Sequence, residues 1–291
     1  MTNPLRAASA VLATMTTVLV LVLAPGTSSA TAATLMGPLR QPGEPAFIAS
    51  HRGDRATAPE NTVPAFEAAI AQGADFVETD VRLSADGVAV IMHDATVDRT
   101  TTGRGAVSDL TAAELTALDA GSWYAPRFAG ARVPLFADFL DVIRSTRGAV
   151  TALVELKGRW EPADVERMVA DIRLRGLEDR IVFASFSMTS LDALRAAAPE
   201  FPRVLIRRVL PIDPVAVAER LGVIALMTRP SALRDRPEVV TELHRAGLGI
   251  LLYTLNTEKR WRDALDWGID GIVTDDCAAL GTWISEAKPE T

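Results

Sequence analysis

Short apolar runs recur along the chain, and each is followed by a polar tip and then by a stretch with helical periodicity. Such runs, rich in Val, Ile and Leu, are typical of strands that are buried on both faces. Eight runs fit this pattern, at residues 46–51, 76–81, 150–156, 181–186, 203–206, 223–227, 249–255 and 271–274. Strands that alternate with helices predict a parallel sheet, and eight such units predict an α/β protein with a closed (β/α)8 TIM barrel.

Start and stop signals frame the helices between these strands. Thr62 is a candidate N-cap, Pro64 falls in the first turn, and Gly73 marks the end of the first helix. A later helix is predicted over residues 162–175, because Gly176 follows directly and favours termination there. These signals agree with the helix positions that the apolar pattern requires.

One segment departs from the regular alternation. After the second strand, residues 84–87 predict a tight turn and residues 88–92 form another apolar run, which together predict a hairpin extension. Residues 94–132 are rich in Thr and Gly and fit no barrel unit. Thr111 and Glu114 have the spacing of a capping box, which predicts one short helix. We therefore expect a small excursion above the barrel mouth.

The amino terminus has the pattern of a secretory signal peptide over residues 1–33. Arg6 precedes an apolar run at residues 10–24, and a tract of small residues follows it. The run is shorter than the roughly 20 apolar residues that span a bilayer. A lipid anchor would need a cysteine after this run, but Cys277 is the only one. We expect a secreted, extracytoplasmic protein without a stable membrane anchor, with residues 34–291 as its barrel domain.

Composition narrows the function classes further. A single cysteine excludes an intrachain disulfide framework, so the fold must be held by packing. The formal net charge of -7 argues against nucleic acid as a partner, since nucleic-acid binders usually carry a basic surplus. A soluble acidic exported protein accounts for this charge, and no feature of the sequence indicates an oligomeric state.

Strand parity predicts where the polar side chains of the second and third strands point. Glu78 and Asp80 share a face, and so do Glu155 and Lys157, because alternate residues of a strand point to the same side. Three carboxylates and one ammonium then converge at the carboxyl ends of the strands, where TIM barrels place their active sites. A divalent cation would relieve the repulsion, whereas a metal-free ion-pair network that includes Arg52 is the alternative.

The ligand type indicates which cation suits this cluster. Carboxylate oxygens favour Mg²⁺, Ca²⁺ or Mn²⁺, whereas zinc sites rely more on His and Cys. The chain has three histidines. His51 and His93 lie at polar strand tips near the acidic residues, which favours an acid/base pair. His244 lies in a helix-like stretch and is predicted to be a surface residue. Phe186 and Asn256 are candidates for the wall of a substrate pocket.

Six motifs together resemble the glycerophosphodiester phosphodiesterase family. Each motif is short, but their order and spacing are specific, and they coincide with the predicted strand ends across residues 48–280. They are His51-Arg52-Gly53, Glu60-Asn61-Thr62, Glu78-Thr79-Asp80, His93-Asp94, Glu155-Leu156-Lys157 and Gly271-Ile272-Val273-Thr274-Asp275.

The resemblance implies a metal-dependent TIM-barrel hydrolase that cleaves glycerophosphodiesters, such as glycerophosphocholine, to an alcohol and sn-glycerol 3-phosphate. One divalent cation, Ca²⁺ or Mg²⁺ with Mn²⁺ as a third candidate, is implied as cofactor. The implied roles are metal ligands for Glu78, Asp80 and Glu155, acid/base catalysts for His51 and His93, and phosphate contacts for Arg52 and Lys157. Glu60 is implied either as a further ligand or as a group that orients Arg52.

Two positions depart from the family pattern. Tyr253 stands where a Trp is common, and Cys277 stands where a Pro often follows the Thr-Asp pair. Tyr253 is counted among the candidate substrate contacts, so this departure leaves the preferred head group open. Asp275 either orients a neighbour at the barrel mouth or caps the following helix.

Other functions remain open at this level. A phospholipase C or D relative would need an apolar rim, for which Trp123, Tyr124 and Phe128 are candidates, although a packed cluster beneath the loop is the alternative. A non-catalytic glycerol-phosphate-binding barrel would usually lack a catalytic residue, and all are present here. A two-carboxylate glycosidase would leave both histidines unexplained.

Overall fold

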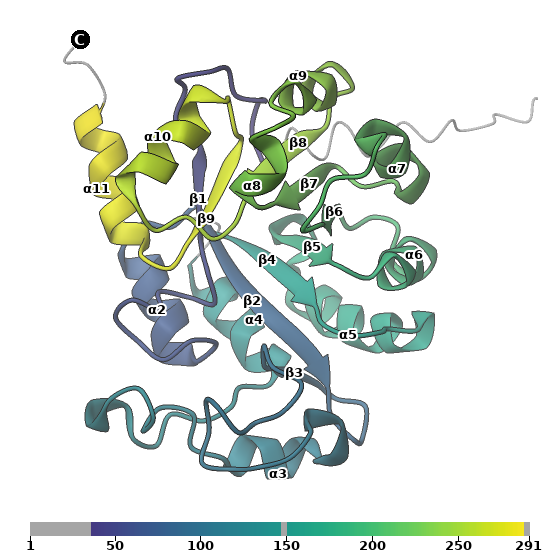
Figure 1. The fold of residues 1–291 in the computed structure, drawn as a ribbon. Helices are drawn as coiled ribbons and strands as arrows, with labels where there is room; N and C mark the ends of the chain where they lie inside the picture. Colours follow the sequence, from purple (N-terminus) through teal and green to yellow (C-terminus); the bar gives the residue numbers. More distant parts are fainter. Residues whose placement is uncertain (1–35, 147–149, 288–291) are drawn as a thin grey trace, which may run out of the picture.

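The structure is a computed structural model that describes residues 36–146 and 150–287 (Figure 1). The predicted signal peptide, residues 1–33, lies outside the described residues. The strands are β1 (Phe47–Ser50), β2 (Phe76–Leu83), β3 (Ala89–Ile91), β4 (Thr151–Leu156), β5 (Ile181–Ser185), β6 (Arg203–Ile206), β7 (Ala225–Thr228), β8 (Gly249–Leu252) and β9 (Gly271–Thr274).

Apart from β3, the strands of the described chain run parallel and close into a barrel. The order around it is β1-β9-β8-β7-β6-β5-β4-β2, and β1 closes the ring because it pairs with both β9 and β2. The eight-stranded barrel predicted from the apolar pattern is therefore confirmed. The predicted bounds are less accurate, since the run at residues 249–255 ends as a strand at Leu252.

Helices form an outer ring around the strands (Figure 1). They are α2 (Val63–Ala71), α4 (Phe136–Ser145), α5 (Pro162–Arg175), α6 (Met188–Ala197), α7 (Pro214–Leu221), α8 (Pro230–Leu233), α9 (Glu238–Arg245), α10 (Glu258–Asp266) and α11 (Cys277–Ala287), with a 3₁₀ turn η3 (Glu178–Arg180). α5 has its predicted bounds, and Gly176 ends it in a left-handed conformation (φ 63°). α2 begins after Thr62 as predicted, but the Thr62 hydroxyl donates to the Pro59 carbonyl instead of capping the helix.

Two apolar layers follow from the alternation of side chains along the strands. Phe47, Leu153 and Val204 belong to a cluster that fills the barrel interior. Val77 and Leu156 belong to a larger cluster between the strands and the helices. The outer face of β2 and β4 is mostly apolar, so the acidic residues of these strands point to the interior, as the sequence predicts.

The excursion after β2 is a packed unit. β2 continues beyond the barrel and pairs with antiparallel β3 through Val81↔Ile91 and Leu83↔Ala89, so the predicted hairpin is confirmed. Between β3 and α4 lie η1 (Val107–Asp109), α3 (Ala112–Ala117) and η2 (Pro126–Phe128). The capping box of Thr111 and Glu114 begins α3, as predicted.

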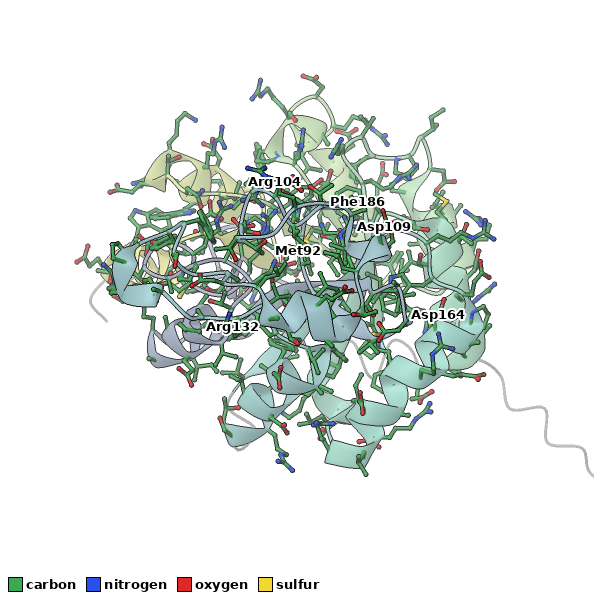
Figure 2. The ribbon with its side chains drawn as sticks, turned by 90° about the horizontal axis from the view of Figure 1, so that it is seen from below. Met92, Arg104, Asp109, Arg132, Asp164 and Phe186 are labelled. Atoms are coloured by element: carbon green, nitrogen blue, oxygen red, sulfur yellow. The ribbon has the colours of Figure 1, made fainter. Side chains whose placement is uncertain are left out.

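A small core of its own holds this unit together. Its buried members are Val90, Met92, Val97, Val107, Leu115, Ala120 and Val133. Figure 2 views the molecule from this side, with Met92, Arg104, Asp109 and Arg132 labelled. The excursion is therefore a rigid neighbour of the barrel mouth, able to hold side chains in place there.

The three aromatic residues of the excursion pack on one another at its surface. Tyr124 makes edge contacts with Trp123 and Phe128, at 5.7 and 5.6 Å between ring centroids. Trp123 is 41% exposed. The Tyr124 hydroxyl donates to the Ala56 carbonyl at 2.7 Å, which ties the excursion to the loop after β1. The cluster is thus partly exposed and has a packing role.

Among the residues that the structure describes, no helix is both long and apolar enough to cross a bilayer.

Candidate active site

A cavity of about 1430 Å³ opens at the carboxyl ends of the barrel strands. Seven of the site residues predicted from the sequence line it: His51, Arg52, His93, Glu155, Lys157, Phe186 and Tyr253. Glu78 and Asp80 are not part of its lining, and they are 3% and 1% exposed. The structure therefore brings the predicted groups together in and beneath one cavity.

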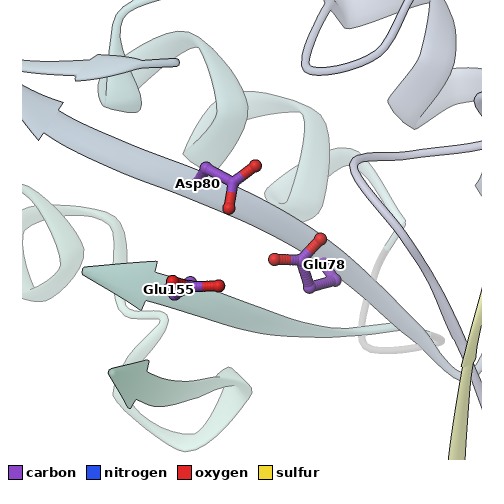
Figure 3. A group of neighbouring side chains, drawn as sticks. All are labelled: Glu78, Asp80 and Glu155. Atoms are coloured by element: carbon purple, nitrogen blue, oxygen red, sulfur yellow. The ribbon is translucent and has the colours of Figure 1, made fainter. Parts of the chain in front are cut away.

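The three predicted carboxylates form one cluster at the base of this site. Glu78 and Asp80 come from β2, and Glu155 comes from β4, where it pairs in register with Asp80 (Figure 3). Each offers an oxygen that lies within 4.8 Å of the other two. Register and parity thus place the three side chains on one side of two adjacent strands.

Burial and mutual repulsion give these acids very different affinities for protons. Burial, together with the charges of Asp80 and Glu155, raises the pKa of Glu78 well above its ordinary value. Burial and Asp80 raise the pKa of Glu155 to about 7. Burial acts on Asp80 too, but Lys157 and Arg52 outweigh it and hold the pKa of Asp80 below its usual range. Without a cation, the cluster favours at least one protonated carboxyl.

The donor set fits a divalent cation. Lys157 Nζ lies 3.0 Å from Asp80 Oδ1 and 2.6 Å from Glu155 Oε1. Neither oxygen has an aligned hydrogen bond among the described residues, although both are buried. Buried carboxylate oxygens without aligned donors are suited to a hard cation, which would also offset the repulsion. Glu78, Asp80 and Glu155 are the residues that would hold it.

Arg52 lies in a sharp turn directly after β1. Its backbone is left-handed (φ 59°), and its amide donates to Glu78 Oε2 at 2.8 Å. Gly53 follows with φ 76°, and a Cβ there would lie 2.6 Å from the backbone carbon of Ala65. This close approach requires glycine. The turn aims the Arg52 side chain at Asp80, with Nε 3.2 Å from Oδ2.

Glu60 is surrounded by arginines, which favours the second of its two predicted roles. Its carboxylate accepts from Arg52 at 2.7 Å and from Arg99 at 2.8 and 3.0 Å, and Arg55 lies 3.2 Å away. Burial would raise the pKa of Glu60, but Arg99 and Arg52 lower it to about 2. Glu60 is absent from the acidic cluster and orients Arg52.

His51 is fixed by a chain of polar side chains. Its Nδ1 lies 2.6 Å from Asp275 Oδ1, and Asp275 Oδ2 accepts from Asn256 Nδ2 at 2.7 Å. Burial lowers the pKa of His51, and the Asp275 carboxylate opposes that shift. Of the two predicted roles for Asp275, orientation of a neighbour is thus what the structure shows. Asn256 lies outside the cavity lining and holds Asp275, instead of shaping the pocket wall.

His93 is fixed in the same way from the other side. Its Nδ1 lies 2.6 Å from Asp94 Oδ1, and Arg99 Nε donates to Asp94 Oδ2 at 2.7 Å. Burial lowers the pKa of His93, and Asp80 opposes this. Both imidazoles therefore carry a carboxylate on Nδ1 and line the cavity, which leaves Nε2 of each for a bound molecule.

Two residues with no predicted role complete the site. Arg99 comes from the excursion and joins Glu60 to Asp94. Asn61 has a left-handed backbone (φ 58°) and donates to Asp80 Oδ2 at 2.8 Å. The sequence offered a signal for Asn61, because this residue belongs to the Glu60-Asn61-Thr62 motif. It offered none for Arg99, which is a single arginine in a segment rich in Thr and Gly.

The third histidine lies away from the cavity. His244 is in α9, with Nε2 3.0 Å from Asp270 Oδ2 and a side chain only 15% exposed. The prediction of a surface residue is therefore inaccurate, because the last turn of α9 packs against the segment that leads into β9.

The fold and the site define a TIM-barrel protein with a candidate cation cluster and two carboxylate-anchored histidines at its catalytic face. Residues 51–279 match the model of the Glycerophosphoryl diester phosphodiesterase family. The chain belongs to this family of enzymes, as the sequence motifs predict.

Similar proteins support this assignment. A glycerophosphodiester phosphodiesterase of Caldanaerobacter subterraneus is 33% identical over 234 residues, which cover 80% of this chain and 96% of the relative. The crystal structure of one from Agrobacterium tumefaciens has a TM-score of 0.71 at 34% identity, with 82% and 100% of the two chains covered. An Oleispira antarctica phosphodiesterase, solved in complex with the product sn-glycerol-3-phosphate, has a TM-score of 0.74 at 29% identity, with 82% and 96% covered.

Proposed function

We propose that this protein is a secreted, metal-dependent phosphodiesterase that hydrolyses glycerophosphodiesters to sn-glycerol 3-phosphate and an alcohol. The observation that carries the proposal is the clustering of Glu78, Asp80 and Glu155 within 4.8 Å at strand ends beneath the cavity that His51 and His93 line. The relatives named above as glycerophosphodiester phosphodiesterases, and the Oleispira antarctica complex with its product, support the substrate class.

The two histidines supply acid/base catalysis in this proposal. Nε2 of one imidazole accepts the proton of the attacking oxygen, which belongs to water or to the substrate's own glycerol 2-hydroxyl. Nε2 of the other donates a proton to the departing alkoxide, so the alcohol leaves neutral. Asp275 and Asp94 hold the two rings by Nδ1 at 2.6 Å and stabilise each imidazolium when it forms.

The cationic side chains bind the phosphoryl group. Arg52 and Lys157 line the cavity beside the acidic cluster, so their charges oppose the negative charge that develops on the non-bridging oxygens. When bound at the three carboxylates, a divalent cation polarises the phosphoryl group and adds to this stabilisation. Glu60 keeps Arg52 in place through its 2.7 Å contact.

The signal-peptide pattern over residues 1–33 supports export of the protein. We therefore propose that it acts outside the cell. Phosphodiesters released from lipids outside the cell would be hydrolysed there to supply glycerol phosphate. Amino-terminal sequencing of protein from the culture medium tests this, and we expect a mature chain that begins between residues 31 and 34. A chain that keeps residues 1–33 and stays in the cytoplasm would contradict it.

The activity is tested by sn-glycerol 3-phosphate release from glycerophosphoinositol and glycerophosphocholine. The protein is first treated with a chelator, and Ca²⁺, Mg²⁺ and Mn²⁺ are then added back separately. We expect release to stop on chelation and to return with at least one cation. Unchanged release after chelation would remove the metal from the proposal, and cleavage of intact phosphatidylcholine alone would replace the substrate.

A further inference from the structure

The two sides of the cavity mouth carry different charges. Four arginines line the side formed by the segments after β6, β7 and β8, namely Arg208, Arg229, Arg234 and Arg260. All four side chains are exposed. In the barrel order β1-β9-β8-β7-β6-β5-β4-β2, these strands lie across the barrel from β1, β2 and β4, which carry the catalytic cluster.

These arginines are not neutralised by acidic side chains of the described residues. Among the described residues, no carboxylate forms an ion pair with any of the four. Eight Lys or Arg residues and two acids line the cavity, whereas the whole chain has a formal net charge of -7. Arginines in a cleft of an otherwise acidic protein concentrate anions there.

The scissile phosphate does not account for this charge. Arg52 and Lys157 already lie beside the acidic cluster, on the opposite side of the mouth. The cavity of about 1430 Å³ also exceeds the roughly 300–1,000 Å³ of most small-molecule sites. A second part of the substrate therefore has room to reach the arginines, and since the glycerol carries no charge, that part is the leaving alcohol.

A cationic leaving alcohol such as choline fits this side poorly. Aromatic rings usually recognise quaternary ammonium groups, and Phe186 and Tyr253 form an edge-on pair in the cavity. However, two cations of the protein already lie near the Phe186 ring, Lys157 Nζ at 5.9 Å and Arg208 Cζ at 5.7 Å from its centroid. A third positive charge there would be repelled.

Tyr253 adds a hydrogen-bond donor on the same side. Its hydroxyl oxygen is buried and makes no well-aligned hydrogen bond among the residues that the structure describes. Tyr253, Arg208 and Arg229 line the same cavity. Burial raises the pKa of the Tyr253 phenol, whereas the charge and side-chain contact of Arg229 and the charge of Arg208 oppose this. A neutral phenol beside two guanidinium groups is a suitable donor set for phosphate oxygens.

We propose that Arg208, Arg229, Arg234, Arg260 and Tyr253 form a distal basic subsite that binds a phosphate group on the leaving alcohol. The preferred substrates are then glycerophosphodiesters whose alcohol is itself phosphorylated, with glycerophosphocholine a poor substrate. This inference rests on the proposed function, because it assigns the scissile phosphate to the β1, β2 and β4 side.

The experiment compares kcat/KM for three substrates that differ in head-group charge: glycerophosphoinositol 4-phosphate, glycerophosphoinositol and glycerophosphocholine. We expect this order of decreasing kcat/KM. In the double variant Arg208→Gln/Arg229→Gln, we expect kcat/KM for the phosphorylated substrate to fall roughly five- to tenfold, in line with measured exposed ion pairs. The neutral substrate should change by less than about twofold.

Arg245→Gln is the matched control. Arg245 is an exposed arginine at the end of α9, which precedes β8 and so lies at the opposite face of the barrel. This variant should keep all three kcat/KM values. If glycerophosphocholine is cleaved as well as glycerophosphoinositol 4-phosphate, or if the double variant lowers all three values equally, the subsite is wrong.

Binding of inositol 4-phosphate, measured by calorimetry, separates this inference from the proposed function. We expect the wild type to bind it and the double variant to bind it at least about fivefold more weakly, whereas inositol should not bind measurably. Weaker binding by the double variant supports the subsite even if no substrate is turned over. A lack of turnover would contradict only the proposed function. Equal binding by both proteins would overturn the subsite even if hydrolysis is observed.

Discussion

The two sides of the barrel mouth use arginine in opposite ways. On the β1, β2 and β4 side, Arg52 and Arg99 are engaged by carboxylates at 2.7 to 3.2 Å, and Glu60 joins them. On the β6, β7 and β8 side, Arg208 and Arg229 are exposed and form no ion pair within the described residues. Ion pairs hold the side chains in position before a substrate binds. Arginines without a carboxylate partner instead keep their full electrostatic attraction for an incoming anion. In our proposal, the first side therefore carries out the chemistry and the second selects the substrate.

Removal of an imidazole should have the largest effect. In His93→Ala, we expect kcat to fall about a hundred- to ten-thousandfold, because general acid/base groups contribute roughly 10² to 10⁴. The measurement is sn-glycerol 3-phosphate release, with circular dichroism to confirm the fold. His244→Gln is the matched control, since that histidine lies away from the cavity, and it should keep wild-type turnover. Near-normal activity in His93→Ala would remove His93 from the mechanism.

Loss of an orienting carboxylate should have the next largest effect. In Asp275→Asn, we expect kcat to fall about ten- to a hundredfold, as for other groups that orient a reacting side chain. The Asp275 carboxylate opposes the lowering of the His51 pKa, so NMR titration should show His51 protonating at a lower pH in the variant.

Asp276→Asn provides a neighbouring control for that variant. The Asp276 carboxylate accepts from the Ala279 amide at the start of α11 and makes no contact with His51. Because Asn also accepts at an N-cap, this variant should keep kcat and the His51 titration. An unchanged His51 titration in Asp275→Asn would mean that the 2.6 Å contact does not govern this imidazole.

Arg99→Gln tests whether the excursion supports the catalytic side. Its contacts help to lower the pKa values of Glu60 and Asp94 to about 2. Without them both acids become protonated at a higher pH, so the acidic limb of the kcat profile should move to higher pH. We expect kcat at neutral pH to fall about tenfold. Arg104→Gln, an 85% exposed position of the same segment, should match the wild type. If the two variants behave alike, Arg99 has no positioning role.

Salt should affect the two sides differently, with the smallest effect. Exposed charges are screened at physiological ionic strength over roughly 8 Å, and buried pairs much less. When ionic strength rises from about 0.05 to 0.5 M, we expect kcat/KM for glycerophosphoinositol 4-phosphate to fall severalfold while its kcat stays constant. An equal loss for glycerophosphocholine would show that salt acts on the enzyme in general.

The catalytic side was largely predictable from the sequence because its groups lie on strands. A period of two fixes which side chains of β2 and β4 point inward, so the convergence of Glu78, Asp80 and Glu155 follows from parity alone. The eight strands followed from the continuous apolar runs, which are typical of strands buried on both faces. Their ends were less predictable, since the pattern does not record where β8 leaves the sheet at Leu252.

The residues that escaped prediction lie on loops. Arg99 reaches Glu60 and Asp94 only because the excursion folds back over the mouth, which no local pattern records. Asn256 was placed on the pocket wall, but it turns to Asp275 through hydrogen bonds that depend on how two loops meet. The four arginines of the distal basic subsite come from three segments that barrel closure alone brings together.

A double-mutant cycle tests the division between the two sides most directly. It combines Asp275→Asn with Arg208→Gln/Arg229→Gln, and kcat and kcat/KM are measured for glycerophosphoinositol 4-phosphate and glycerophosphoinositol. We predict that the first change lowers kcat for both substrates, that the second lowers kcat/KM only for the phosphorylated one, and that the effects add within about 0.5 kcal/mol. If the arginine changes lower kcat for both substrates, or if the effects couple by more than about 1 kcal/mol, the two sides do not act separately.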